Sequence, residues 1–225
     1  MYIKSSYDLF YALKRLDYLY IAKDFWWWPN SGTFEVVIGA ILTQQTKWER
    51  VEESLYNLDR SNLLSPESLS SGNLEQIAAC IKPSGFYNTK AHRLQTLSSN
   101  ILKDFGSFEN FQKNVSRVWL LEQKGIGMES ADSILCYGCK RDIFVVDSYT
   151  KRLLDAFGYT FDDYTQLQEW MQKGIKENLK TVKGLYPEDL DLSAIYARFH
   201  GKIVEYAKEH IRGQIVDIKP LLDLI

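Results

Sequence analysis

Cysteine is scarce in this chain of 225 residues, which contains only Cys80, Cys136 and Cys139. An odd, low count with no signal peptide argues against a disulfide scaffold and indicates the reducing cytoplasm. Cys136 and Cys139 form a C-x-x-C pair, but the sequence has no second pair to complete a zinc or iron–sulfur site. We therefore interpret all three cysteines as ordinary buried thiols.

Long apolar runs and an excess of one charge are also missing. No apolar run approaches the ~18 residues that span a bilayer, so we expect no membrane partner. Residues 1–20 read as an amphipathic helix and not as a targeting peptide. The 27 Lys and Arg residues nearly balance the 29 Asp and Glu residues, which leaves a net charge of −2. A nucleic-acid partner would therefore have to be held by a local basic cluster.

Apolar residues recur at helical spacing over most of the chain. One such stripe comprises Phe34, Val37, Ile38, Ile41 and Leu42. A second comprises Leu192, Ile195, Tyr196, Phe199, Ile203 and Val204. Strict alternation is not sustained anywhere, and the one β-like run, at 143–146, is too short to build a sheet. The sequence therefore predicts an all-α fold whose helices are separated by Pro and Gly clusters.

The stretch 121–150 is the most informative part of the sequence. A Gly125-Ile126-Gly127 turn joins two helical stretches, and a lone aspartate, Asp147, follows an apolar run. Such a turn can present backbone N–H groups to a phosphate, and its glycines let a sugar–phosphate backbone approach closely. Alone, a G-x-G turn is weak evidence for DNA binding, and capping of the helix expected from Ser148 is a sufficient role for Asp147.

The register of these features resembles the helix-hairpin-helix–GPD superfamily of DNA glycosylases, in which an L-P-G-x-G hairpin precedes a V-D-[ST] motif. In its endonuclease III branch, a catalytic lysine stands where Glu129 stands here, eighteen residues before the aspartate (147 − 129). The resemblance extends to the stretches 40–45, A-I-L-T-Q-Q, and 85–91, G-F-Y-N-T-K-A. It covers roughly residues 33–155.

Departures from the family pattern change the expected chemistry. A carboxylate at Glu129 cannot form the Schiff base through which bifunctional members cut the strand. Its remaining roles are interaction with the N-terminal end of the second hairpin helix and shaping of the base pocket. Lys124 replaces the hairpin proline, which is tolerable because backbone N–H groups bind the phosphate. No cysteine follows Cys139, so no iron–sulfur cluster is expected. The resemblance thus implies a monofunctional enzyme that leaves an abasic site.

The aromatic residues favour a cationic base as substrate. Three consecutive tryptophans, 26–28, precede Pro29, and Trp48 follows Gln45. They cannot all face one way on a helix, so we expect some in the core and others at a pocket. At a pocket, cation–π attraction would stabilise a bound cationic base by ~0.5–2 kcal/mol. With T-Q-Q-T at 43–46 and A-R-F-H-G-K at 197–202, this segment resembles the endonuclease III-like 3-methyladenine DNA glycosylases. That resemblance implies hydrolysis of the glycosidic bond of alkylated purines.

Two other functions and one other role for the tryptophans stay open. The first function is that of an endonuclease III-type oxidised-base glycosylase and AP lyase. The second is that of a non-catalytic helix-hairpin-helix module that only binds DNA. An aspartate in register with the hairpin argues against the second, because binding alone needs no carboxylate near phosphates. The tryptophan cluster could also serve only to pack the core.

The resemblance also implies roles for individual residues. Asp147 would stabilise the developing oxocarbenium ion and orient or deprotonate the attacking water. Gln45 would fill the space left by the flipped base, and Phe86 would wedge into the opposite strand. The other expected sites are a base pocket of Trp27, Trp28, Pro29, Trp48, Glu129 and Lys208; DNA contacts at Lys90, Lys124, Gly125 and Gly127; and backbone carbonyls of Leu121, Gln123 and Ile126 for a sodium or potassium ion when DNA is bound.

Lysines near the C-terminus raise an electrostatic question. Lys202 and Lys208, six residues apart (208 − 202), are predicted to approach the same side of the last helix. A free ammonium would repel a cationic base, so we hypothesise that one of them is paired with a carboxylate or carbamylated.

The sequence thus predicts a monomeric enzyme with no required cofactor, acting on double-stranded DNA that contains an alkylated base. Its location would be cytoplasmic, at the nucleoid if the source is bacterial. We expect two helical lobes flanking an active-site cleft. One is a six-helix barrel at 33–141 that carries the hairpin, and the other combines 1–32 with 142–225.

Overall fold

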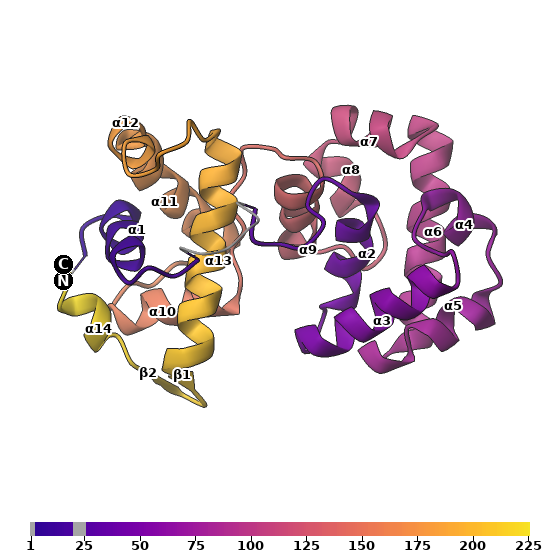
Figure 1. The fold of residues 1–225 in the computed structure, drawn as a ribbon, viewed down its shortest axis with the longest axis horizontal. Coiled ribbons are helices and arrows are strands. Elements are labelled where there is room, and N and C mark those ends of the chain that lie inside the picture. The colour runs from indigo at the N-terminus through magenta and orange to yellow at the C-terminus, as the bar shows by residue number, and fades with distance from the viewer. Residues whose placement is uncertain (1–2, 20–25) are drawn as a thin grey trace. The chain divides into compact units, whose positions relative to one another are not determined.

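The computed structural model describes residues 3–19 and 26–225, and within them the fold is all-α apart from one two-stranded hairpin (Figure 1). The all-α prediction is confirmed. The chain divides into two compact units: unit 1 comprises Met1–Pro29 and Arg141–Ile225, and unit 2 comprises Asn30–Lys140. Residues 1–2 and 20–25, which include parts of the predicted N-terminal helix and lobe, lie outside the described residues.

Unit 2 is built around α2 (Phe34–Leu42), which is buried on nearly every side. The sequence pattern predicts one apolar stripe on this helix, but Val36, Gly39 and Ala40 are buried as well, as expected for a central helix. The other elements of unit 2 are α3 (Trp48–Arg60), α4 (Pro66–Ser71), α5 (Leu74–Cys80), the 3₁₀ turn η1 (Lys82–Ser84), α6 (Tyr87–Phe105), α7 (Phe108–Asn114), α8 (Arg117–Leu121), α9 (Met128–Ser133) and the π-helical segment η2 (Ile134–Gly138).

Several short helices of unit 2 begin at side chains that satisfy otherwise free backbone N–H groups. Ser65, Asn73, Ser107 and Ser116 each accept a hydrogen bond from the N–H three residues later. These residues define the first turns of α4, α5, α7 and α8. The last of them, Ser116, sets the start of the helix that leads into the glycine turn.

An ion pair joins the two helices on either side of that turn. Arg117 on α8 donates to Asp132 on α9 through Nε at 2.6 Å and through Nη2 at 2.9 Å. The Asp132 side chain is fully buried, whereas that of Arg117 is 29% exposed. A buried carboxylate needs such a partner because it has lost its hydration. The pair therefore holds α8 and α9 together at the base of the turn.

Unit 1 packs around α13 (Leu192–His210), the long orange helix of Figure 1. Its other elements are α1 (Ser6–Arg15), α10 (Ser148–Ala156), α11 (Tyr164–Glu177), α12 (Leu179–Lys183), α14 (Lys219–Leu222) and the antiparallel strands β1 (Ile211–Arg212) and β2 (Ile215–Val216). In the core, the Phe199 ring of α13 lies 5.3 Å from the rings of both Phe10 and Phe144. The run 143–146 is largely buried and forms no strand, in line with its short length.

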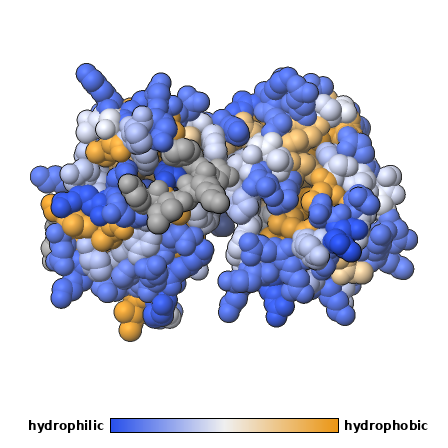
Figure 2. Space-filling view, viewed as in Figure 1, coloured by the Kyte–Doolittle hydropathy of each residue, from blue (hydrophilic) through white to orange (hydrophobic). Residues whose placement is uncertain are grey.

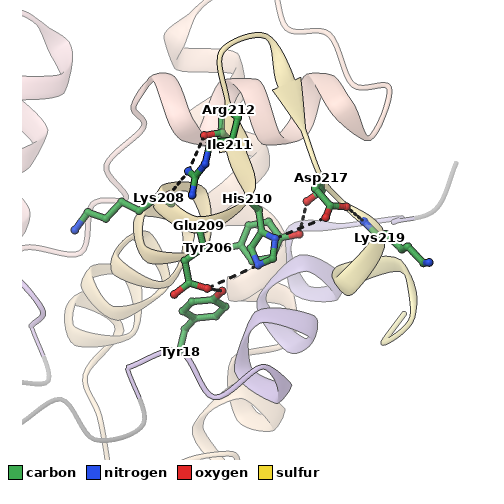
Figure 3. A network of polar contacts seen from close by, with 9 residues as sticks. All are labelled: Tyr18, Tyr206, Lys208, Glu209, His210, Ile211, Arg212, Asp217 and Lys219. Atoms are coloured by element: carbon green, nitrogen blue, oxygen red, sulfur yellow. Dashed lines mark hydrogen bonds and ion pairs between the residues drawn. The ribbon is translucent and has the colours of Figure 1, made fainter.

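The C-terminal end of α13 is tied to the segments beside it (Figure 3). The Tyr18 hydroxyl donates to the Glu209 carboxylate at 2.6 Å, and the Tyr206 hydroxyl donates to the Asp217 carbonyl at 2.5 Å. His210 stacks on Tyr206 with ring centroids 4.3 Å apart. These contacts fix the last turns of the helix that carries much of the site described below.

Hydrophilic residues cover most of the face shown in Figure 2, with smaller groups of hydrophobic residues between them. Among residues 3–19 and 26–225, no helix has both the length and the apolar character that crossing a membrane requires.

The Arg117–Asp132 pair yields a prediction about stability. We expect Asp132→Ala to lower the free energy of unfolding by about 2–3 kcal/mol, because Arg117 is left partly buried beside an empty site. The control is Glu53→Ala, which removes an exposed pair with Arg50 and is expected to cost less than about 1 kcal/mol. Urea unfolding of both variants measures the difference, and equal losses would contradict the role of the buried pair.

Candidate active site and DNA-contacting loops

Asp147 is the N-cap of α10 and uses its two carboxylate oxygens differently. Oδ1 accepts hydrogen bonds from the backbone N–H and the hydroxyl of Thr150, both at 2.8 Å. Oδ2 lies 3.5 Å from Nε2 of His200 on α13. The capping role that the sequence left open is therefore real, and it occupies one oxygen while the other points to a histidine.

The ionised state of Asp147 is favoured although its side chain is only 13% exposed. Burial by itself would raise the pKa of this carboxyl. The contact with His200, its charge when protonated, and the two bonds from Thr150 outweigh burial and hold the pKa below its ordinary value. Asp147 is thus a carboxylate at neutral pH, which is the form that can stabilise positive charge or accept a proton.

Trp27 lies against α13 next to this carboxylate–histidine pair. Its ring centroid is 5.4 Å from that of His200, with the two planes nearly perpendicular. Its indole Nε1 donates to Glu205 Oε1 at 3.0 Å. Gly201 makes this approach feasible, because a Cβ at that position would come within 2.4 Å of the Trp27 ring. One helix thus aligns the histidine, the indole and a carboxylate.

Lys208 completes the cluster through Glu205. Its Nζ lies 2.9 Å from Glu205 Oε1 and 6.0 Å from the centroid of the Trp27 ring. The hypothesis that one of the two C-terminal lysines is paired with a carboxylate therefore holds for Lys208. Its charge next to the indole is balanced by that of Glu205.

Lys202 does not share the surroundings of Lys208. It is buried, and its Nζ donates to the Tyr18 carbonyl. Burial, followed by the charges of Arg198 and Lys14, lowers its pKa to about 7, against the opposing effect of Asp17. The prediction that the two lysines approach one side is wrong, since six residues at ~100° each leave them far apart around the helix.

The three consecutive tryptophans divide between different surroundings. Trp26 packs against the core of unit 1. Trp28 is buried, with its ring edge-on to that of Trp27 at 6.4 Å, and Pro29 is exposed. Trp27 itself has a left-handed backbone, with φ of +65°. That conformation turns the chain sharply and lets neighbouring indoles take different directions, so Trp27 is the one placed beside Asp147 and His200.

In unit 2, the turn between α8 and α9 is shaped by Gly125. Its φ of +87° favours glycine, and a Cβ there would lie 2.3 Å from Arg93 Nε. Gln44 Nε2 donates to the Gly125 carbonyl at 2.9 Å, and Arg93 Nη1 donates to Gln44 Oε1 at 2.9 Å. The turn therefore contacts side chains from α6 and from the loop after α2. Lys124 and Gly127 are exposed and open space surrounds the position of a Cβ at Gly127.

Two other predicted residues of unit 2, Glu129 and Trp48, lie at the starts of helices. Glu129 is exposed in the first turn of α9, where its charge interacts favourably with the helix N-terminus. Trp48 is the first residue of α3 and is half-buried. The Gln123 carbonyl accepts the Ile126 N–H at 3.0 Å within the turn, whereas Leu121 is the last residue of α8.

Gln45 and Phe86 are exposed and both have left-handed backbones, with φ of +54° and +46°. Lys90, which we predicted to contact DNA, is only 2% exposed. Its ammonium donates to the Leu42 carbonyl, the Thr46 hydroxyl and the Ser84 carbonyl, each at 2.8 Å. Burial, then Arg93, lowers its pKa to about 8. The structure thus gives Lys90 an internal role in place of the predicted phosphate contact.

Three contributors to the site from α13 were missed in the sequence. His200 and Gly201 lie inside the A-R-F-H-G-K stretch that carried the resemblance, but nothing in that pattern pairs them with Asp147 or Trp27. Glu205 stands on the same helix, three residues before Lys208, and that spacing was the available signal of an ion pair. Whether such a pair also meets an indole depends on tertiary packing.

The fold therefore places the chain in the class of all-α, helix-hairpin-helix proteins, with a glycine turn between two short helices in unit 2 and an ionised N-cap aspartate beside an indole in unit 1. The chain belongs to the HhH-GPD superfamily of base excision DNA repair proteins, whose family model matches residues 38–177. It is a DNA glycosylase of the endonuclease III-like type, and the resemblance found in the sequence is confirmed.

Individual relatives support this membership. A protein of Methanocaldococcus jannaschii named as a proposed DNA repair glycosylase is 36% identical over 193 residues, covering 83% of this chain and 81% of that protein. Endonuclease III of Thermotoga maritima is 26% identical over 188 residues, covering 82% of this chain and 78% of that one.

Solved structures show the same fold. The 3-methyladenine DNA glycosylase of H. pylori, bound to 1,N6-ethenoadenine, is 46% identical with a TM-score of 0.89, covering 93% of this chain and all of that one. An endonuclease III trapped covalently on DNA is 18% identical, with a TM-score of 0.69 over 99% of this chain and 96% of that one. The second likeness concerns the fold alone.

The Asp147–His200 contact predicts a change in pH dependence. If the carboxylate of Asp147 is the form that acts in base release, activity is lost as the pH falls through its pKa, which the surroundings lower. We expect His200→Leu to move this acid limb of kcat/KM to higher pH, because a contact that lowers the pKa is removed. His200→Gln keeps an N–H donor and is expected to shift the limb less. Superimposable acid limbs for the wild type and the Leu variant would contradict the assignment.

Proposed function

We propose that this chain is a monofunctional DNA glycosylase that hydrolyses the glycosidic bond of alkylated purines, chiefly 3-methyladenine, and leaves an abasic site. It would act as a monomer on double-stranded DNA. The observation that carries the proposal is the Trp27 platform, an indole bonded to a carboxylate and placed next to the Asp147–His200 pair. The 46% identity to a 3-methyladenine DNA glycosylase supports the same substrate class.

The platform suits a cationic base. An indole that donates its N–H to the Glu205 carboxylate has more electron density on its ring, which strengthens attraction to a cation above it. Lys208 would oppose a cationic base, but Glu205 balances its charge. 3-Methyladenine in DNA carries a formal positive charge, so it meets a π-face and no uncompensated ammonium.

Asp147 would carry out the hydrolysis. The bond from C1′ to the base nitrogen breaks, its electron pair neutralises the departing cationic base, and the sugar becomes an oxocarbenium ion. Oδ2 of Asp147 stabilises that charge and takes a proton from the water that attacks C1′. Because the base leaves as a neutral molecule, no general acid is needed. Oδ1 stays occupied by Thr150, which holds the carboxylate in place.

Glu129 supports hydrolysis without strand cleavage. An amine at this position could attack C1′ and form a Schiff base, whereas a carboxylate cannot. Its exposed position at the start of α9 is consistent with favourable interaction at the helix N-terminus. The abasic product would therefore be released intact.

The hairpin would hold the DNA backbone. Gly125 and Gly127 let phosphates approach backbone N–H groups, and the exposed Lys124 adds a positive charge. The carbonyls of Leu121, Gln123 and Ile126 are hard oxygen donors of the kind that alkali cations take. Gln123 uses one lone pair for Ile126 and keeps a second. A sodium or potassium ion bound there would supply positive charge to a phosphate.

Base release from methylated duplex DNA tests the proposal. We expect the wild type to release 3-methyladenine and to form no adduct with DNA under borohydride. Asp147→Asn is expected to slow release by about 100-fold or more, since a general base is lost. An asparagine Oδ1 still accepts the Thr150 N–H, so the helix cap and duplex binding are retained. A borohydride-trapped adduct, or full activity in the Asn variant, would overturn the mechanism.

We expect variants of Glu205 and Lys208 to change the selectivity for cationic bases in opposite directions. Glu205→Gln leaves the Lys208 charge unbalanced and is expected to lower the ratio of the release rate of cationic 3-methyladenine to the affinity for a duplex with neutral 1,N6-ethenoadenine by about 10-fold, within the range of a cation–π contact. Lys208→Met leaves a net negative charge and is expected to raise the same ratio.

The matched control for this prediction is Glu209→Gln. It makes the same charge change on the same helix, but Glu209 bonds Tyr18 and not Trp27 (Figure 3). Equal shifts of the ratio in the Glu205 and Glu209 variants would show that only the overall charge matters.

A further inference from the structure

Two loops of unit 2 present exposed residues in a conformation that is unfavourable for their side chains. Gln45 follows α2 and Phe86 precedes α6, and both have left-handed φ values, +54° and +46°. Phe86 is 69% exposed. A non-glycine residue in this conformation costs about 1–2 kcal/mol, so other contacts have to hold it.

Those contacts meet at one buried ammonium. Lys90 Nζ donates to the Leu42 carbonyl and the Thr46 hydroxyl, on either side of Gln45, and to the Ser84 carbonyl, two residues before Phe86. All three distances are 2.8 Å, so every N–H of the ammonium has an acceptor.

A second contact links the loops directly. The Thr46 hydroxyl donates to the Ser84 carbonyl at 2.5 Å, so Ser84 accepts from both Thr46 and Lys90. Within the described residues, the loop before α3 and the loop before α6 therefore share a single hydrogen-bonded centre. Neither can shift without breaking bonds to the buried charge.

We propose that Lys90 is a positioning residue that locks the loops carrying Gln45 and Phe86 into one rigid unit for insertion into duplex DNA. The inference rests on the proposed function and on the DNA-inserting roles that the sequence resemblance implies for these two residues. Because both loops are already ordered before DNA binds, they lose less conformational entropy when a base is extruded. Lys90 acts through the loops and does not touch the substrate.

Lysine is the side chain suited to this role. Its unbranched stem reaches from α6 through the packed core, and its tetrahedral ammonium donates to three acceptors outside that helix. The planar guanidinium of arginine presents its donors as a fork and would not match them. Methionine fills the volume of the stem but leaves the three oxygens without a donor.

The same face of α6 is also connected to the hairpin by hydrogen bonds. Arg93, three residues beyond Lys90, donates to Gln44, whose amide donates to the Gly125 carbonyl. Gln44 is next to Gln45, so the loop tip is connected both to Phe86 and to the turn that holds phosphates. The locked unit thus has a fixed position on unit 2.

Base unstacking tests the proposal without any methylated base. A duplex carries a tetrahydrofuran abasic analogue with 2-aminopurine opposite it, and a rise in fluorescence reports insertion. We expect Lys90→Met to slow the rise by about 10-fold or more, as for a displaced positioning group, with affinity for undamaged duplex within about 2-fold. Lys103→Met is the matched control, since Lys103 is an exposed lysine of the same helix and its loss is expected to change neither quantity.

Variants of Thr46 keep the test valid if Lys90→Met unfolds the protein. Thr46→Val removes the hydroxyl and is expected to slow insertion, whereas Thr46→Ser keeps it and is expected to behave as the wild type. If the contacts form one unit, the Lys90→Met, Thr46→Val double variant loses about as much as Lys90→Met alone. Additive losses, equal behaviour of the Val and Ser variants, or wild-type insertion by Lys90→Met would overturn the proposal.

The outcomes for insertion and for base release can be separated. A wild-type protein that unstacks the 2-aminopurine but releases no 3-methyladenine would refute the proposed substrate and leave the role of Lys90 standing. Normal release with no fluorescence change in the wild type would refute insertion by these loops, and the role of Lys90 with it.

Discussion

Keeping a nearly buried carboxylate ionised is the constraint on which the site of unit 1 depends. Asp147 loses most of its hydration, so protein donors have to replace it. Thr150 supplies two of them through the N-cap of α10, and His200 supplies a third contact from α13. The same charge that caps a helix is thereby available for chemistry, because the cap uses only one oxygen. Stability and function are joined in one residue, and its position is set by two helices.

Unit 2 uses buried charge for a different purpose. Asp132 pairs with Arg117 below the hairpin, and Lys90 serves three oxygens beneath two exposed loops. In each case an ion without full hydration is matched by directed hydrogen bonds, which fix geometry more strictly than apolar contacts do. The exposed residues that would meet DNA therefore stand on a rigid base. A net charge of −2 is compatible with this arrangement, because the charges that organise the loops are internal.

Sequence reasoning succeeded where a motif is local, and it failed where the outcome depends on the direction in which a side chain points. The turn at Gly125, the helix after Asp147 and the family could be read from residues close together in the chain. Lys90 was predicted to contact DNA because it flanks the motifs of the resemblance, but the sequence does not show that three oxygens surround it. Lys202 and Lys208 were placed on one side, although their spacing leaves them far apart around a helix. Their surroundings also differ, since one is buried and the other pairs with Glu205.

By itself, the sequence determined the all-α class, the membership in the glycosylase superfamily and the absence of a lysine nucleophile at position 129, because each follows from residue type and spacing. Only the tertiary structure decided which groups act together. It placed His200 and Glu205 of α13 against Asp147 and Trp27, and it turned Lys90 inward. The physical reason is that a motif defines backbone register, whereas the pairing of charges and rings depends on how distant helices pack.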